Sequence, residues 1–281
     1  MPSSRFGWLV SYPKSGNTWL RVMLSSVLSR GAPIDINSTA LKGDIATFAE
    51  LDEFLCIEAS ELTRDEIAAS RPALHASLAA NLREDLILRK VHDRFWHTPS
   101  GEAVFVPALS RGAVYLIRDP RDVALSYAHH RGLDVDRLID LMADASMILS
   151  DVTIRGREQL PQPLGSWSGH ALSWLDQREI PVLMIRYEDM LADPLTYLGR
   201  AAAHLGLATT PAALAAAIEA ASFDRLRTQE QTHGFRERQK EATSHFFREG
   251  RAGTWRDRLS PAQIDRIVTG HAAVMRRFGY L

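Results

Sequence analysis

The chain has 281 residues, of which 46% are hydrophobic, and this is enough for one large or two small domains around a buried core. The near balance of 33 Lys and Arg with 34 Asp and Glu argues against a general nucleic-acid or membrane-surface binder. The single cysteine, Cys56, excludes an internal disulfide, and no apolar run is long enough to span a membrane. The first residues lack the charged-then-apolar pattern of a leader peptide, so none is expected. We therefore expect a cytoplasmic protein without nucleic-acid or membrane partners.

Buried strands are predicted by four short apolar runs, at residues 8–12, 86–91, 113–117 and 182–185. Amphipathic helices are predicted between and after them. Apolar residues repeat at helical spacing from Leu20 and stop before Gly31, a second helix opens at Asp193 and Pro194, and a third has a capping box at Ser260.

This alternation of strands and helices predicts an α/β fold with a central, mostly parallel sheet flanked by helices. Neither an internal repeat nor a linker rich in Gly, Ser or Pro divides the sequence, so we interpret residues 1–281 as a single domain. Ligands in such sheets bind beyond the carboxyl ends of the strands.

The loop between the first strand and its helix, residues 12–19, reads Tyr-Pro-Lys-Ser-Gly-Asn-Thr-Trp. Backbone N–H groups at a helix start attract anions, Lys14 adds a full positive charge, and Gly16 allows close approach. The loop is not a Walker A motif, because its lysine precedes the glycine. The alternative is a solvated turn that binds nothing.

A second segment begins with Arg118, at the expected end of the third strand, and continues into a helix that contains Ser126. The guanidinium and this hydroxyl can hold one phosphate together. The alternative is a set of surface ion pairs among Arg118, Asp119, Arg121 and Asp122, which contribute little.

A third segment, residues 246–255, places Gly250 and Gly253 beside Arg248 and Arg251, so that backbone amides can face an anion. It lies within a basic stretch, residues 225–258, that we expect to be a mobile loop capping the cofactor. The alternative for the segment is a flexible basic loop without a ligand.

Together the three segments resemble the family of sulfotransferases that use 3'-phosphoadenylyl sulfate (PAPS). The first is similar to the family's YPKSGTTW loop for the 5'-phosphosulfate, a P-loop-like element, with Asn17 replacing a threonine. The second is similar to the R-x₇-S element and the third to the RKGxxGxW loop, which both contact the 3'-phosphate. Glu249 stands where the third loop has a lysine, so one cation is missing.

The resemblance implies that PAPS and its product 3'-phosphoadenosine 5'-phosphate (PAP) are bound here, with Trp19 and Tyr187 flanking the adenine. The cofactor-binding residues would be Lys14, Ser15, Gly16, Asn17, Thr18, Trp19, Arg118, Ser126, Tyr187, Ser222, Phe223, Arg248, Glu249 and Gly250.

Sulfuryl transfer to a hydroxyl requires charge stabilisation on the leaving phosphate and removal of the hydroxyl proton. We assign the phosphate charge to Lys14 and the proton to His92, at the tip of the second strand, because a neutral imidazole is available near pH 7. The resemblance adds Lys90, near the transferring group, and Ser126, which would contact Lys14 and the 3'-phosphate. The alternative for His92 is a structural, hydrogen-bonded histidine.

The acceptor pocket is expected from residues 34–62, 95–97 and 131–167. These stretches hold apolar side chains that predict a small, partly apolar hydroxyl acceptor, while their carboxylates leave a cationic acceptor open. The apolar side chains are Phe48, Phe54, Trp96, Met142 and Met147.

No metal is expected, because lysine and backbone donors can replace it and no His/Cys/Asp cluster has ligand spacing. A homodimer is left open: the family's tail motif is only approximated by Arg256, Ser260 and Asp265, and Pro261 replaces its valine. Two other functions are considered, a PAP- or PAPS-binding protein without turnover and, less favoured, a small-molecule kinase on a P-loop scaffold.

Overall fold

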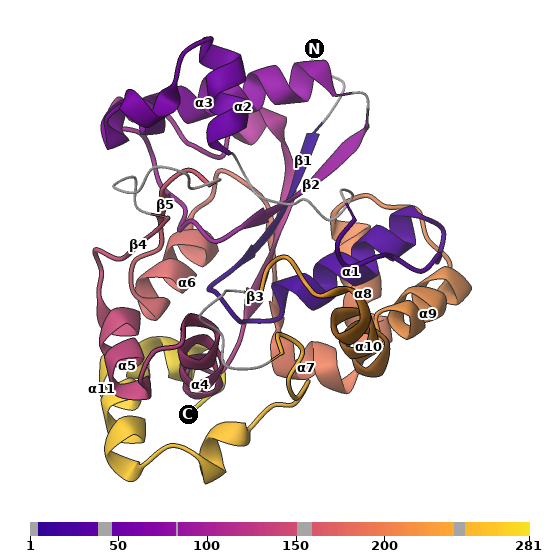
Figure 1. Ribbon diagram of the computed structural model, residues 1–281, viewed down its shortest axis with the longest axis vertical. Coiled ribbons are helices and arrows are strands. Elements are labelled where there is room, and N and C mark those ends of the chain that lie inside the picture. Colours follow the sequence, from indigo (N-terminus) through magenta and orange to yellow (C-terminus); the bar gives the residue numbers. More distant parts are fainter. Residues whose placement is uncertain (1–4, 39–46, 83, 151–158, 239–244) are drawn as a thin grey trace.

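A four-stranded parallel sheet lies at the centre of the computed structural model, which describes residues 5–38, 47–82, 84–150, 159–238 and 245–281 (Figure 1). The strand order is β2-β1-β3-β6, and every neighbouring pair is parallel. The bounds are β1 (Arg5–Ser11), β2 (Leu86–Val91), β3 (Ser110–Ile117) and β6 (Val182–Arg186). The four predicted strands and the α/β fold are thus confirmed, and the carboxyl ends of the strands meet at one edge.

Both faces of the sheet are buried, as the crossover helices of parallel strands require. Side chains alternate along β1, so that Phe6, Trp8 and Val10 pack into one core and Leu9 into the other. Strand β3 alternates in the same way.

Two groups of helices cover the two faces (Figure 1). The core that contains Trp8 is covered by α2 (Phe48–Leu55), α3 (Arg64–Asn81), α4 (Pro120–Arg131), α5 (Val135–Ala143), α6 (Trp167–Asp176) and α11 (Pro261–Arg277). The core that contains Leu9 is covered by α1 (Asn17–Leu28), α7 (Tyr187–Ala192), α8 (Pro194–His204), α9 (Pro211–Ala220) and α10 (Phe223–His233). Short elements complete the fold: β4 (Ile148–Leu149), β5 (Gln162–Pro163) and the 3₁₀ turns η2 (Ala59–Glu61), η3 (Pro107–Leu109) and η4 (Thr254–Asp257).

The predicted helix starts follow from their capping residues. Asp193 accepts a hydrogen bond from the backbone N–H of Thr196 at 3.1 Å and opens α8. Ser260 forms the predicted capping box with Gln263 and opens α11, with Pro261 as its first residue. Two of the residues that approximate the family's tail motif therefore start a helix in this chain.

The stretch expected to be a loop, residues 225–258, is partly helical. Residues 225–233 belong to α10, because Leu226 packs into the second core, and residues 254–257 form η4. Residues 239–244 lie outside the described part of the chain. Residues 225–233 are therefore helical rather than part of a loop, and a mobile loop that caps the cofactor stays a prediction.

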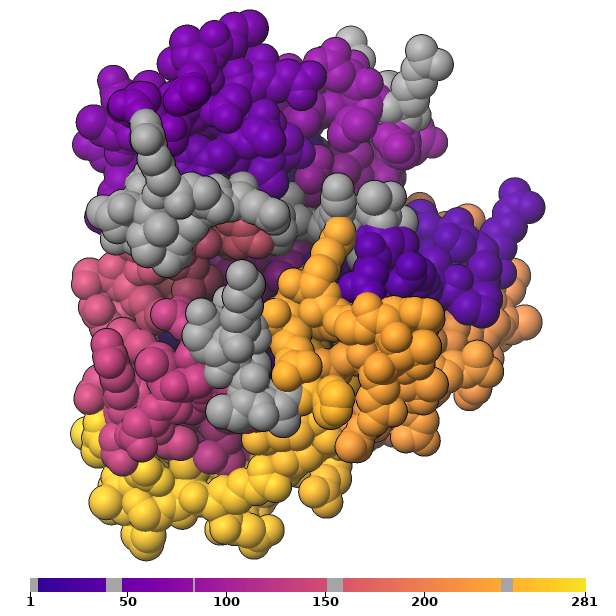
Figure 2. Space-filling view, viewed as in Figure 1, coloured from indigo at the N-terminus to yellow at the C-terminus, as the bar shows by residue number. Residues whose placement is uncertain are grey.

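The N-terminal region packs against this C-terminal stretch. Gln229 of α10 accepts a hydrogen bond from the backbone N–H of Ile36 at 3.1 Å. Figure 2 shows the indigo N-terminal segment directly beside the orange helices of this region.

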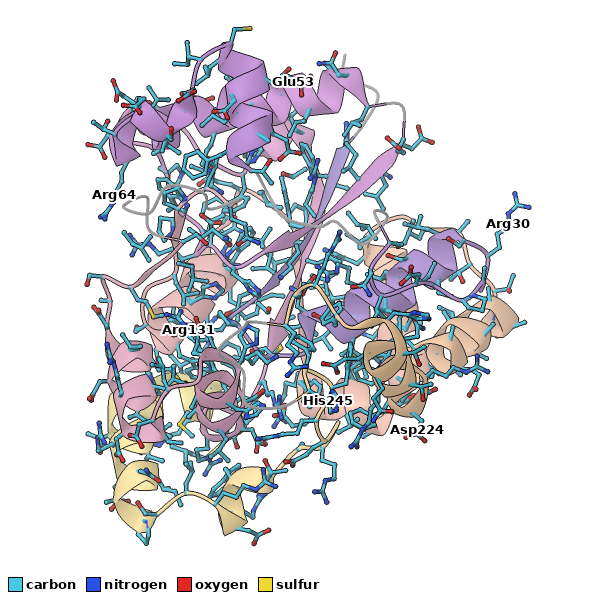
Figure 3. All side chains as sticks on the ribbon, in the orientation of Figure 1. Arg30, Glu53, Arg64, Arg131, Asp224 and His245 are labelled. Atoms are coloured by element: carbon cyan, nitrogen blue, oxygen red, sulfur yellow. The ribbon has the colours of Figure 1, made fainter. Side chains whose placement is uncertain are left out.

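Charged side chains point outward on α2 and α10, as Glu53 and Asp224 do, and in the turn after α1, as Arg30 does (Figure 3). Exceptions such as Arg21 and Arg71, each at most 2% exposed, need an anion nearby. Across the described ranges, no helix has the length and apolarity to cross a membrane.

Candidate active site

A cleft of about 1720 Å³ opens at the carboxyl edge of the sheet. It is lined by the β1–α1 loop, the ends of β2 and β3, α4, α7, the start of α10 and the segment around Gly250. The three anion-binding segments predicted from the sequence thus share one cleft. All predicted site residues line it except Ser15, which belongs to the β1–α1 loop and is fully buried.

The β1–α1 loop owes its shape to two residues with left-handed backbone, Lys14 (φ 68°) and Gly16 (φ 98°). A Cβ at Gly16 would lie 2.6 Å from Cδ2 of Tyr187, so the ring and the loop can approach this closely only with glycine. Asn17 donates from Nδ2 to the carbonyl oxygen of Leu9 at 2.7 Å and so fastens the loop to β1. The asparagine that departs from the family motif therefore stabilises the loop.

Lys14 supplies the cation of this loop. Burial, together with Arg118 and Lys90, lowers the pKa of Lys14 to about 7, while Glu237 opposes the shift. Its ammonium lies 3.4 Å from the ring centroid of Phe246. A bound anion would stabilise the charged form, so the loop fits a phosphate.

Ser15 supports the same fit. Its hydroxyl is buried and finds no hydrogen-bond partner among the described residues. Buried hydroxyls are normally satisfied, and an anion at the loop can satisfy this one.

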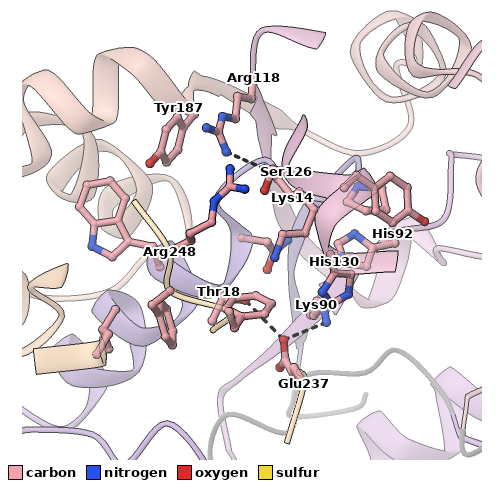
Figure 4. A pocket seen from close by; sticks show the side chains of 18 of the residues that line it. Lys14, Thr18, Lys90, His92, Arg118, Ser126, His130, Tyr187, Glu237 and Arg248 are labelled. Carbon is pink, nitrogen blue, oxygen red and sulfur yellow. Dashed lines mark hydrogen bonds and ion pairs between the residues drawn. The ribbon is translucent and has the colours of Figure 1, made fainter. Parts of the chain in front are cut away.

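Arg118 follows β3 and links the first and third segments. Its guanidinium donates to the carbonyl oxygens of Lys14 and Arg251, both at 3.0 Å, and lies 4.4 Å from the ring centroid of Tyr187. Ser126, half-buried on α4, lies beside Arg118 and Lys14 in the close-up of the cleft (Figure 4). Arg118 and Ser126 therefore line the same part of the cleft, and their joint contact with a phosphate stays a prediction.

In the second segment, Asp119, Arg121 and Asp122 are buried, so the alternative of surface ion pairs is wrong for these three residues. Asp119 and Arg121 form a buried pair at 2.8 Å. Asp122, 1% exposed, accepts hydrogen bonds from the backbone N–H of Gly253 at 2.6 Å, from that of Trp255 at 3.1 Å and from the Thr254 hydroxyl at 2.9 Å. Asp122 thus anchors the third segment to α4, a role that sequence reasoning missed.

The third segment packs against the start of α10. Gly250 has φ 61°, and a Cβ there would lie 2.7 Å from Cδ2 of Phe223. Phe223, Trp19 and Tyr187 line the same end of the cleft. Trp19 and Tyr187 meet edge to face, with ring centroids 6.2 Å apart.

Glu249 lies among three arginines rather than exposing a lone charge. Its carboxylate is 2.6 Å from Arg258, 3.1 Å from Arg248 and 3.7 Å from Arg251. Although burial opposes the shift, Arg258 and Arg248 hold the pKa of Glu249 below its usual value. The carboxylate therefore neutralises part of the positive charge that the arginines bring to this end of the cleft.

His92 follows β2 at the other end of the cleft. Its Nδ1 lies 2.8 Å from the carbonyl oxygen of Ser11, which can only accept, so Nδ1 carries the proton and Nε2 the lone pair. Burial and the charge of Lys90 hold the pKa of His92 well below its usual value. The imidazole is therefore neutral at pH 7.

Buried contacts hold the backbone around His92. His170 donates from Nε2 to the carbonyl oxygen of His92 at 3.0 Å, and the Tyr115 hydroxyl donates to Nδ1 of His170 at 2.7 Å. Asp93 forms a bidentate buried pair with Arg71, at 2.7 and 3.2 Å. The sequence carried no signal for either contact.

Two further residues line the cleft: His130, which the sequence indicates as a helix-surface or acceptor-pocket residue, and Glu237, which no sequence pattern singled out. His130, on α4 one turn after Ser126, lies close to Lys90 and His92 (Figure 4). Burial and the charges of Lys14 and Lys90 lower the pKa of His130 to about 3. Glu237 contacts Lys90 from the segment after α10.

The stretches expected to form the acceptor pocket contribute unequally. Described residues that line the cleft are Thr47, Phe48, Ala49, Glu50, Arg131, Leu149, Ser150, Gln159 and Gln162. Met142 and Met147 lie in the core, Phe54 and Trp96 pack against it, and His97 pairs with Glu179 at the surface. The turn at residues 95–97 therefore lies away from the cleft, and residues 39–46 and 151–158 lie outside the described part.

Within the described residues, no group of three or more His, Cys, Asp or Glu side chains is arranged to hold a metal ion. The charges of the cleft come from the lysines, arginines and carboxylates named above.

A family model decides the assignment, since the Sulfotransferase domain matches residues 7–279. The chain belongs to this sulfotransferase family. PAPS is the sulfuryl donor of sulfotransferases and PAP is the product.

Curated relatives agree with this assignment. Cytosolic sulfotransferase 16 of Arabidopsis thaliana is 25% identical over 276 residues, which cover 92% of this chain and 73% of the relative. Sulfotransferase 1B1 of Mus musculus is 24% identical over 263 residues and covers 92% of this chain and 79% of its own.

Solved structures share the fold. Mouse sulfotransferase SULT7A1, complexed with PAP, has a TM-score of 0.60 and 21% identity, covering 98% of this chain and 85% of that one. Retinol dehydratase, solved with androsterone and PAP, has a TM-score of 0.62 and 19% identity, covering 98% of this chain and 81% of that one.

Proposed function

We propose that this sulfotransferase transfers the sulfuryl group of PAPS in line to the hydroxyl of a small acceptor, with His92 as the general base. The observation that carries the proposal is the fixed tautomer of His92, which keeps a basic Nε2 at the end of a cleft rich in cations. A neutral imidazole with a defined lone pair suits proton removal at neutral pH.

The donor would lie along the cleft, with its 3'-phosphate near Arg118, Ser126 and Arg248 and its adenine near Trp19 and Tyr187. The 5'-phosphosulfate would lie on the β1–α1 loop. Two observations support this direction: the buried, unsatisfied hydroxyl of Ser15 and the lowered pKa of Lys14 both favour an anion at the loop.

In the transfer step, Nε2 of His92 takes the hydroxyl proton while the acceptor oxygen forms the new O–S bond. The S–O bond to the 5'-phosphate breaks, and its electron pair remains on the phosphate of PAP. Lys14 and the loop amides stabilise the charge on this phosphate, and Lys90 stabilises the charge of the sulfuryl group in the transition state of transfer.

The acceptor would enter beside Phe48 and Leu149 and meet the polar groups of Gln159, Gln162 and Arg131. This mixture supports a partly apolar acceptor that also carries a polar group. Retinol dehydratase, solved with androsterone, shares the fold, so a ligand of that size is included among the acceptors to test. A homodimer stays a prediction.

The test combines retention on immobilised PAP with label transfer from radioactive PAPS to phenols, alcohols, sterols and glycosides. We expect His92→Ala to keep its affinity for PAP and to lose about 10²–10⁴-fold in turnover, the usual contribution of a general base. His97→Ala, which alters an exposed histidine outside the cleft, is the matched control.

Wild-type turnover in His92→Ala would refute the role of His92. Retention on PAP without transfer to any acceptor would favour the alternative of a binding protein. ATP consumption that depends on magnesium would favour the kinase.

A further inference from the structure

Glu237 places a carboxylate between two groups of the proposed donor site. Its Oε2 lies 3.3 Å from Nζ of Lys90 and 3.4 Å from the Thr18 hydroxyl, which donates to it. Its Oε1 pairs with Arg21 of α1. Figure 4 shows Glu237 below Lys90 and Thr18, with both contacts drawn.

Arg21 holds the carboxylate of Glu237 in place through its ion pair with Oε1. The arginine is 2% exposed, and two of its nitrogens, Nε and Nη1, find no hydrogen-bond partner within the described ranges. A buried guanidinium needs an anion, and Glu237 supplies it. Although burial opposes the shift, Lys90 and Arg21 hold the pKa of Glu237 well below its usual value, so the carboxylate is ionised at neutral pH.

PAPS and PAP would use two partners of Glu237, Thr18 and Lys90, differently. Thr18 belongs to the loop proposed for the 5'-phosphate, which PAPS and PAP share. Lys90 is proposed to contact the sulfuryl group, which only PAPS carries. A sulfuryl oxygen that reaches Lys90 must therefore replace Oε2 of Glu237 or lie beside an ionised carboxylate.

We propose that Glu237 is an internal anion that competes with the sulfuryl group for Lys90 and so weakens donor binding relative to product binding. The inference rests on the proposed function. Glu237 contacts Lys90 when the nucleotide is PAP and loses that contact when it is PAPS. Transfer of the sulfuryl group restores the contact, so the residue disfavours the donor ground state, an effect that promotes transfer.

The ratio of the two dissociation constants tests the inference. Titration calorimetry with PAPS and with PAP, each without acceptor, is compared for the wild type and Glu237→Gln. We expect the Kd of PAPS to fall about tenfold further than that of PAP, because the loss of charge beside Thr18 affects both nucleotides but only PAPS gains at Lys90. A tenfold change is a typical coupling between contacting residues. Both nucleotides carry similar total charge at this end, so loss of a distant charge would change both constants alike.

Glu249→Gln is the matched control, because it removes one carboxylate from the other end of the same cleft. It should change both constants by the same factor. Glu237→Asp keeps the charge on a side chain one methylene shorter, which should lengthen its contact with Lys90. We therefore expect a smaller shift of the ratio in the same direction, even where the glutamine variant fails to fold. In a Lys90→Met background, either change at Glu237 should leave the ratio unaltered.

An equal effect of Glu237→Gln on both nucleotides, or weaker binding of PAPS alone, would overturn the inference and leave the proposed function intact. Wild-type protein that binds neither nucleotide would instead overturn the proposed function.

Discussion

Nδ1 of His92 lies 2.8 Å from the carbonyl oxygen of Ser11, so the end of β1 determines which nitrogen of the histidine after β2 is basic. The two strands are neighbours in register, with Val10 opposite Val91. The contact is therefore a consequence of parallel pairing, and it leaves Nε2 rather than Nδ1 as the unprotonated nitrogen for the proposed role as base.

The first prediction concerns the acid limb of the pH profile. Burial lowers the pKa of His92, so the base form is present at neutral pH and is lost only as the pH falls through this lowered value. In kcat/KM for PAPS, which reports the free enzyme, we expect no loss from His92 near its usual pKa of about 6.5. A limb at that pH that disappears in His92→Ala would contradict the lowered pKa of His92, although it would still support His92 as the base.

The second prediction concerns the alkaline limb. The pKa of Lys14 is about 7 in the ligand-free protein, and a bound phosphate raises it. PAP affinity should therefore be fully present below pH 7 and fall above it, by up to about tenfold per pH unit.

Titration calorimetry from pH 6 to 9 measures this limb. Lys14→Arg keeps its charge throughout the range and should remove the dependence, even if it binds PAP less tightly. An affinity of the wild type that stays flat above pH 7 would show that Lys14 does not contact the phosphate.

The third prediction concerns the anchor of the glycine-rich segment. Asp122→Asn replaces one accepting oxygen with a donor that faces the N–H of Gly253, and hydrogen bonds to charged groups contribute about 1.5–3 kcal/mol. We expect PAP to bind about tenfold more weakly, which corresponds to about 1.4 kcal/mol. Asp257→Asn, an exposed carboxylate of the same segment, should bind as the wild type does.

Short-range patterns made much of this molecule predictable. Apolar runs give the strands because β1 and β3 are buried on both faces, and the loop at Lys14 and Gly16 follows from a strand, a glycine and a helix start close together in the sequence. Their shared cleft follows from parallel strands, whose carboxyl ends meet at one edge.

The contacts that hold the site were not predictable in this way. Asp122 and Gly253 are 131 residues apart, and Thr18 and Glu237 are 219 apart, so no local pattern joins them. From the sequence, Asp122 entered only the alternative of surface ion pairs, whereas tertiary packing buries it. The prediction that Met142 and Met147 line the acceptor pocket is wrong for a related reason, because both side chains lie in the core.

The last prediction concerns the buried pair that supports the chain next to His92. Asp93 is fully buried. Its carboxylate accepts hydrogen bonds from Nη1 and Nη2 of Arg71 and, at 3.2 Å, from Nε1 of Trp96. Asp93→Asn leaves the guanidinium buried without a counter-charge, and breaking such a pair costs about 3–5 kcal/mol. Urea unfolding should report a loss of this size.

Glu179→Gln, which breaks the exposed pair with His97, should change the free energy of unfolding by less than about 1 kcal/mol. Replacing both partners, as in Arg71→Met with Asp93→Leu, should recover stability, because no charge is left buried. If Asp93→Asn alone unfolded at the wild-type urea concentration, Arg71 would have to find another anion, and the pair would have no part in fixing the backbone of His92.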